Sequence, residues 1–276
     1  MAFISFRTPD GRARFGRIER DAVVDLSGDT ALDLKAALAS GALDTLSAGA
    51  RFALHAIDLL PVVPNPGKIL CVGHNYESHR QETGRAKVDH PSIFIRFADT
   101  LVAADAPIVR PRVSSHLDFE GELAVVIGRG GRAIPESQAT DHIAGYACFN
   151  DASVRDWQWH TSQFAPGKNF PGTGSLGPQL ITAAEAGDLS DVHVVTTLNG
   201  YVVQDQPIRD MIFPIAKIIA YLSAFTPLSP GDVIATGTPG GVGAKREPPL
   251  WMKPGDVVTV AIGPIGTLTN PIIDET

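Results

Sequence analysis

The chain has 276 residues, of which 44% are hydrophobic and 19% charged, a composition typical of globular proteins that excludes a disordered chain. Its net charge of -7, without a block of lysines and arginines, excludes a basic surface for nucleic acid or anionic membrane, and no apolar run is long enough to span a bilayer. Two isolated cysteines and the absence of a signal-peptide pattern predict a cytoplasmic protein without disulfides or cysteine-bound zinc.

A small N-terminal module is predicted over residues 1–62. Turn and alternation signals favour strands, and apolar spacing favours helices. The predicted strands are residues 2–8, 14–19 and 22–27, and the predicted helices are residues 31–40 and 50–60. Three prolines in PVVPNPG, residues 61–67, mark a connector and place the domain boundary between 1–62 and 63–276.

The second predicted domain, residues 63–276, consists mostly of strands and turns. A short polar helix is predicted over 75–83, ending at Gly84, and an amphipathic helix over 211–225. Strands are predicted at residues 68–73, 92–97, 117–128, 144–151, 179–183, 191–200, 232–237 and 256–263. The expected fold class is therefore α+β and predominantly β.

Two glutamates in LDFEGELAVVIG stand two residues apart. On a strand, Glu120 and Glu122 project from the same face, and such like charges are costly to bury unless a cation lies between them. A solvent-facing edge strand is the alternative, but the apolar AVVIG that follows favours burial. Asp151 ends another apolar strand and is a third candidate ligand. Three carboxylates suit a hard ion, Mg2+ or Mn2+.

Five separated segments make the chain recognisable. They are KILCVGHNYESH, DFEGELAVVIGRGGRAI, AGYACFNDASVRDWQ, GKNF and DMIFPIAKIIAYLSAFTPLSPGDVIATGTPGGVG. In order and approximate spacing they resemble the fumarylacetoacetate hydrolase family, notably its short bacterial acylpyruvase-like members, over residues 68–273. The resemblance implies the family's β-roll of mixed sheets with a small N-terminal α/β module, assembled as a homodimer.

The resemblance also implies roles for individual residues. Glu120, Glu122 and Asp151 would bind the metal, and His79 and Glu82 would form a catalytic dyad on a mobile lid helix. Spaced three apart, His79 and Glu82 share a helix face, so the carboxylate can orient the imidazole as a general base. A solvated helix with an incidental ion pair is the alternative.

Four further residues match positions near the substrate. The resemblance assigns Lys168 to catalysis and Gln158 and Thr238 to contacts with substrate or metal-bound oxygens. Arg96 interrupts an apolar strand, and it either binds a substrate carboxylate or is a structural ion-pair partner. Pro171 replaces the acidic residue that many relatives carry after the lysine motif, so the resemblance does not determine the identity of the substrate.

The function predicted first is hydrolysis of a C–C bond in acylpyruvate-like or 2,4-diketo acids. Water activated by His79 would attack a carbonyl, and the metal with Lys168 would stabilise the leaving enolate. The same site without attacking water predicts a decarboxylase or isomerase of a β-keto acid, and a non-catalytic binding protein is the third possibility. The chain lacks the spacing of a phosphate loop, a dinucleotide fingerprint and a serine-hydrolase elbow.

Overall fold

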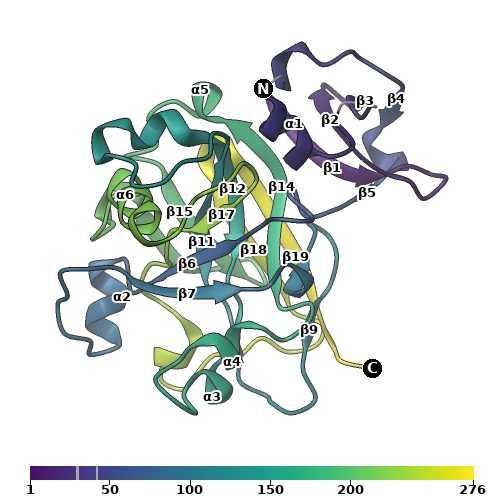
Figure 1. The fold of residues 1–276 in the computed structure, drawn as a ribbon. Coiled ribbons are helices and arrows are strands. Elements are labelled where there is room, and N and C mark those ends of the chain that lie inside the picture. Colours follow the sequence, from purple (N-terminus) through teal and green to yellow (C-terminus); the bar gives the residue numbers. More distant parts are fainter. Residues whose placement is uncertain (29–30, 42) are drawn as a thin grey trace.

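A mixed β-sheet runs from the N-terminal strands into the centre of the computed structural model, which describes residues 1–28, 31–41 and 43–276 (Figure 1). Neighbouring strands are antiparallel except for two parallel pairs, β17 with β6 and β8 with β14. In order across the sheet the strands are β4 (Arg51–Ala53), β3 (Ala22–Asp25), β2 (Ala13–Glu19), β1 (Ala2–Arg7), β14 (Gly174–Thr182), β12 (Ile143–Asn150), β11 (Gly121–Ile127), β17 (Val233–Ala235), β6 (Ile69–Gly73) and β7 (Ser92–Arg96), with β5 (Asp58–Leu59) on β1 and β8 (Leu101–Val102) on β14.

A second sheet packs against β11 and β12. In order its strands are β16 (Tyr201–Pro207), β15 (His193–Leu198), β18 (Val257–Ile262), β19 (Gly266–Asp274) and β9 (Ile108–Arg110), and a separate short pair is formed by β10 (Leu117–Asp118) and β13 (Ser153–Val154). Leu123 of β11 and Cys148 of β12 share a buried cluster with Val260 and Leu268 of the second sheet. Because side chains alternate along β11, the side opposite Leu123 carries Glu122. Strands β16 and β19 were not predicted from the sequence.

Few helices accompany these sheets. They are α1 (Leu34–Ser40), α2 (Glu77–Glu82), α3 (Arg155–Gln158), α4 (Ala165–Lys168), α5 (Ala183–Ala186) and α6 (Ile215–Phe225). Helix α6 buries Ile218 and Leu222 against Leu70 of β6 and Val125 of β11. Its predicted start at residue 211 is wrong, because Pro214 favours extended backbone before it and the helix begins only at residue 215. The fold class is confirmed: α+β and predominantly β, with mixed sheets.

One predicted helix, over residues 50–60, is absent from the structure. That segment forms β4, a short 3-10 turn and β5. Phe52 pairs with Val23 of β3, and Leu59 pairs with Phe6 of β1, so their apolar side chains complete a small core between strands. The prediction is wrong because apolar spacing that fits a helix also fits short strands when neighbouring strands supply the partners.

Among the described residues, the N-terminal strands pair with the main sheet between β1 and β14, and Phe3 and Phe15 share a buried cluster with Phe149 and Leu176. Ala2 and Phe3 of β1 pair with Ile181 and Leu180 of β14. Figure 1 shows the first strands and α1, in purple, beside rather than within the larger body. The division into residues 1–62 and 63–276 stays a prediction. Among the described helices, none is long and apolar enough to cross a bilayer.

Candidate active site

The three predicted carboxylates come together where β11 and β12 pair. Gly121 lies opposite Asn150, and the backbone N–H of Asp151 donates to the carbonyl of Glu120 at 2.9 Å. This register places Asp151 beside Glu120, while the two-residue period of β11 adds Glu122. One oxygen from each of these three side chains lies within 4.8 Å of the others, and all three side chains are buried. Since β11 runs between β12 and β17, the solvent-facing edge strand is excluded.

Gly121, between the two glutamates, allows the second sheet to approach. A Cβ built there would lie 2.0 Å from Oγ1 of Thr196 on β15, so any larger residue would push the sheets apart. Its backbone is also held by side chains, because its N–H donates to Oε1 of Gln204 at 3.0 Å and its carbonyl accepts from Thr238 at 2.9 Å. The glutamates are therefore fixed in position by the backbone between them.

Two buried cations, Arg96 and Lys168, offset much of the negative charge of Asp151 and Glu120. Arg96 Nη1 lies 2.5 Å from Asp151 Oδ1, and Lys168 Nζ lies 2.7 Å from Glu120 Oε2 and also bonds to Asp151 Oδ2. Burial opposes the charge of Lys168, but Asp151 and Glu120 outweigh it and raise the lysine pKa, so the ammonium stays charged. The structure thus places Arg96 in a buried ion pair, the structural role considered for it, while its binding of substrate stays a prediction.

Glu122 differs from its neighbours because, in the described part of the chain, no arginine or lysine bonds to it. Its Oε2 accepts the backbone N–H of Gly237 at 2.7 Å, and Gly237 has a φ of 104° that favours glycine. Burial and the charges of Asp151 and Glu120 raise the pKa of Glu122 well above its ordinary value. A divalent ion would supply the missing positive charge, so the donor set fits Mg2+ or Mn2+.

Arg155 is a site residue that the sequence interpretation missed. It lies on α3. Its Nε lies 2.8 Å from Asp118 Oδ2, its Nη2 lies 2.6 Å from Glu120 Oε1, and its Nη1 donates to Gln158 Oε1 at 2.8 Å. Burial opposes ionisation of Glu120, but Arg155 and then Lys168 outweigh it and lower the glutamate pKa. Its only sequence signal was its place four residues after Asp151, between the aspartate and glutamine motifs.

Replacing Arg155 with glutamine should lower the free energy of unfolding by about 3 kcal/mol, because it leaves Asp118 and Glu120 buried with less positive charge. Urea unfolding with chelator present measures this loss. Arg112→Gln, at an exposed arginine bonded to Glu275, is the matched control and should change stability by under about 0.5 kcal/mol. Equal stability of both variants would show that Arg155 does not hold the site together.

Helix α2 brings the predicted dyad over the carboxylates. His79 Nδ1 lies 2.7 Å from Glu82 Oε1, and Glu82 Oε2 accepts the backbone N–H of Gly241 at 2.9 Å. The side chain of Asn75 anchors the start of the helix, donating to the carbonyls of Phe213 at 3.1 Å and Thr236 at 2.7 Å. Because His79 is only 5% exposed, the solvated-helix alternative does not hold.

A small inner cavity of about 20 Å3 collects most of the predicted catalytic and substrate-binding residues. Its lining includes His79, Gln158, Lys168 and Thr238 together with Glu120. Gln204, which bridges Gly121 and Thr238, was missed because strand β16 was not predicted. The structure therefore gathers around one cavity residues that are far apart in sequence.

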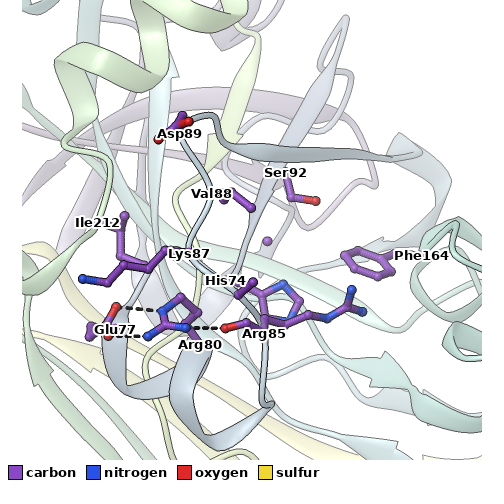
Figure 2. A pocket seen from close by; sticks show the side chains of 12 residues that line it. His74, Glu77, Arg80, Arg85, Lys87, Val88, Asp89, Ser92, Phe164 and Ile212 are labelled. Atoms are coloured by element: carbon purple, nitrogen blue, oxygen red, sulfur yellow. Dashed lines mark hydrogen bonds and ion pairs between the residues drawn. The ribbon is translucent and has the colours of Figure 1, made fainter.

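A larger outer cavity of about 460 Å3 lies between α2, the loop that follows it and Phe164 (Figure 2). Gly73, His74 and Phe164 line both the inner and the outer cavity. His74 has a positive φ of 55° and stacks on His79 with ring centroids 5.1 Å apart. Burial, with the nearby His79, lowers the pKa of His74 to about 4, so its ring is neutral near pH 7. The sequence interpretation left His74 without a role.

Comparison with known proteins gives consistent matches. Residues 68–273 match the C-terminal domain of fumarylacetoacetate (FAA) hydrolase. The chain is 41% identical over 219 residues to the mitochondrial oxaloacetate tautomerase of Xenopus laevis, covering 79% of this chain and 69% of that protein. It matches over full length a fumarylacetoacetate hydrolase from Exiguobacterium antarcticum, at 34% identity and TM-score 0.87. A 2-hydroxyhepta-2,4-diene-1,7-dioate isomerase from Mycobacterium marinum matches at 31% identity and TM-score 0.82, covering 100% of this chain and 99% of that one. This chain therefore belongs to the fumarylacetoacetate hydrolase family.

Proposed function

We propose that this protein is a divalent-metal-dependent isomerase that interconverts the keto and enol forms of small 2-oxo acids. The observation that carries the proposal is the placement of His79, paired with Glu82 at 2.7 Å, on the inner cavity that Glu120 also lines. A base beside a cation site is the combination that proton transfer next to a carbonyl requires. Family enzymes act on small keto acids, which agrees with this substrate class.

The ion would be held by Glu120, Glu122 and Asp151, which fit it in charge and donor type. When bound, Mg2+ or Mn2+ would polarise the carbonyl oxygen of the substrate and so acidify the neighbouring carbon.

The protein's own residues would then transfer the proton. Glu82 occupies Nδ1 of His79, which leaves Nε2 as the atom that takes the proton from the carbon beside the carbonyl and returns it. The backbone N–H of Gly241 donates to Glu82 Oε2, which fixes the carboxylate and so keeps the imidazole in its orientation. Because the cavity is buried, bulk water is excluded and the electrostatic interactions of the charged groups around it are stronger than in water. Lys168 keeps its positive charge at the cavity wall and would stabilise negative charge on the enolate.

The names of the relatives favour the alternative prediction over the first. The Xenopus laevis protein is named a tautomerase and the Mycobacterium marinum protein an isomerase, and both names describe isomerisation without C–C cleavage. Hydrolysis of acylpyruvates and decarboxylation of oxaloacetate are the competing outcomes on the same site. The homodimer and the cytoplasmic location stay predictions, and the relative from Xenopus laevis is described as mitochondrial.

A direct assay separates these reactions. Purified protein with Mg2+ should accelerate the approach of oxaloacetate to keto–enol equilibrium, followed by enol absorbance, while pyruvate and CO2 stay at the level of a sample without enzyme. Rapid release of pyruvate and CO2 from oxaloacetate would instead identify a decarboxylase, and loss of the diketone absorbance of acetylpyruvate a hydrolase. No effect of the protein on the keto–enol relaxation would refute the proposal.

A further inference from the structure

The outer cavity is larger than a four-carbon acid bound at the carboxylates would use. Its volume of about 460 Å3 is that of a small-molecule site in its own right, whereas the inner cavity of about 20 Å3 is close to the size of one water molecule. An acid as short as oxaloacetate, with its 2-oxo group held at the triad, would leave the outer cavity without a role. A longer substrate would use both cavities.

The inner and outer cavities are adjacent and share lining residues, and a longer substrate would extend past these residues from one cavity into the other. His74 and Phe164 line the inner and outer cavities and also a third, of about 150 Å3, between them and Gln158. Their rings meet edge-on, with centroids 5.9 Å apart. His74 is held here by a backbone conformation that non-glycine residues rarely adopt, and such strain clusters at functional sites. A planar, unsaturated carbon chain suits a passage walled by rings.

Positive charge borders the outer cavity on the α2 side. Arg80 is already engaged, because its guanidinium binds Glu77 through two hydrogen bonds, at 2.9 and 2.6 Å, and donates to the carbonyl of Arg85. Arg85, in contrast, has no ion-pair partner in the part of the chain that the structure describes, and its guanidinium lies 5.9 Å from the centroid of the Phe164 ring. Figure 2 shows the Arg85 side chain directed toward Phe164, with Arg80 turned to Glu77.

Position distinguishes Arg85 from the other basic residue of this loop. Of the three cavities, Lys87 lines the outer one alone, whereas Arg85 lines both the outer cavity and the third cavity that Gln158 borders. Gln158 in turn lines the inner cavity. Arg85 therefore borders the cavity next to the one at the carboxylate triad, where the far end of an extended substrate bound at the triad would lie.

We propose that Arg85 binds the distal carboxylate of an extended dicarboxylic 2-oxo acid or its dienol, which makes it a specificity-determining residue. The inference rests on the proposed function, since it assumes that the 2-oxo end sits at the triad. A guanidinium matches a carboxylate through two parallel hydrogen bonds, and stacking on Phe164 orients it for that contact. The related Mycobacterium marinum structure is named for a seven-carbon dioate, a substrate of this length and charge.

The test compares two substrates that differ only in the distal carboxylate: 2-hydroxyhepta-2,4-diene-1,7-dioate and 2-hydroxyhexa-2,4-dienoate. Arg85→Gln should raise KM for the dioate about fivefold or more, with little change in kcat, and should not raise it for the monocarboxylate. Arg85→Lys should raise KM for the dioate less, because the positive charge remains but the paired hydrogen bonds of a guanidinium are lost. Lys87→Gln removes the same charge from the same loop and should raise KM for the dioate less than about twofold.

Several results would overturn the assignment of Arg85. They are an unchanged KM for the dioate in Arg85→Gln, an equal rise for both substrates, an equal rise in Lys87→Gln, or a wild-type enzyme that isomerises oxaloacetate but not the dioate. Failure of the proposed function looks different, because the wild-type protein would then isomerise neither oxaloacetate nor either dienol.

Discussion

Replacing Glu122 with glutamine is expected to abolish metal binding and turnover together while leaving the metal-free protein at least as stable as the wild type. Glu122 is the proposed ligand that no arginine or lysine bonds to among the described residues, and its charge is opposed by burial and by Asp151 and Glu120. Glutamine keeps an oxygen to accept the Gly237 N–H, removes the unfavourable charge and offers donors to the neighbouring carboxylates. It no longer supplies the charge that a hard cation requires.

The stability difference should depend on pH in a defined direction. Burial and the charges of Asp151 and Glu120 raise the folded-state pKa of Glu122, so the folded metal-free protein keeps this proton to a higher pH than the unfolded chain does. Above the unfolded value of about 4.3, the unfolded chain loses this proton while the folded chain keeps it, and stability falls as pH rises toward the folded pKa. Glu122→Gln lacks this loss, so its advantage over wild type should grow from about pH 4.3 upward.

Calorimetric titration with Mn2+ and thermal unfolding in chelator measure the two effects. Asp151→Asn is the instructive contrast: it should also lose metal, but with a loss of about 3 kcal/mol in metal-free stability, because Arg96 and Lys168 lose a buried counter-charge. Asp232→Asn, at a buried aspartate paired with Lys68 at 2.7 Å, should lose stability and keep metal affinity. Tight Mn2+ binding by Glu122→Gln would remove that residue from the ligand set.

Replacing His79 with glutamine should slow isomerisation by about two orders of magnitude while metal affinity stays within about twofold of wild type. The imidazole lines the inner cavity, has a carboxylate on Nδ1 and, among the described residues, has no hydrogen-bond partner on Nε2, which can therefore accept a proton. Losing a positioned general base typically costs this factor. Metal affinity is spared because His79 is not among the residues of the carboxylate triad.

Glu82→Gln distinguishes a working dyad from a packed histidine. Its amide can still accept the N–H of Gly241 but cannot support positive charge on His79, so kcat should fall by about tenfold, with KM little changed. Steady-state rates on oxaloacetate with saturating Mg2+ measure both variants. His55→Gln, at an exposed histidine in the short 3-10 helix between β4 and β5, is the control for losing an imidazole as such. A near-normal rate in His79→Gln would take the dyad out of the mechanism.

Much of the site could be predicted because it depends on spacing within single elements. Glu120 and Glu122 share a face because strand side chains alternate, and His79 and Glu82 share one because they are three apart on α2. The apolar run after Glu122 indicated an interior strand, and β11 is one. The wrong helix over residues 50–60 arose where local spacing fitted two elements and neighbouring strands decided between them.

The sequence by itself determined the family, the predominantly β fold class and the residue types of the site. Only the tertiary structure decided which cations face which carboxylates, so that Arg96 holds Asp151, Arg155 holds Glu120, and Glu122 has no arginine or lysine bonded to it among the described residues. Periodicity fixes the face of an element on which a side chain lies, but the chain that packs against that face comes from a distant part of the sequence. The charge balance of a buried site, and with it the charge that a proposed metal ion would offset, is a property of that packing.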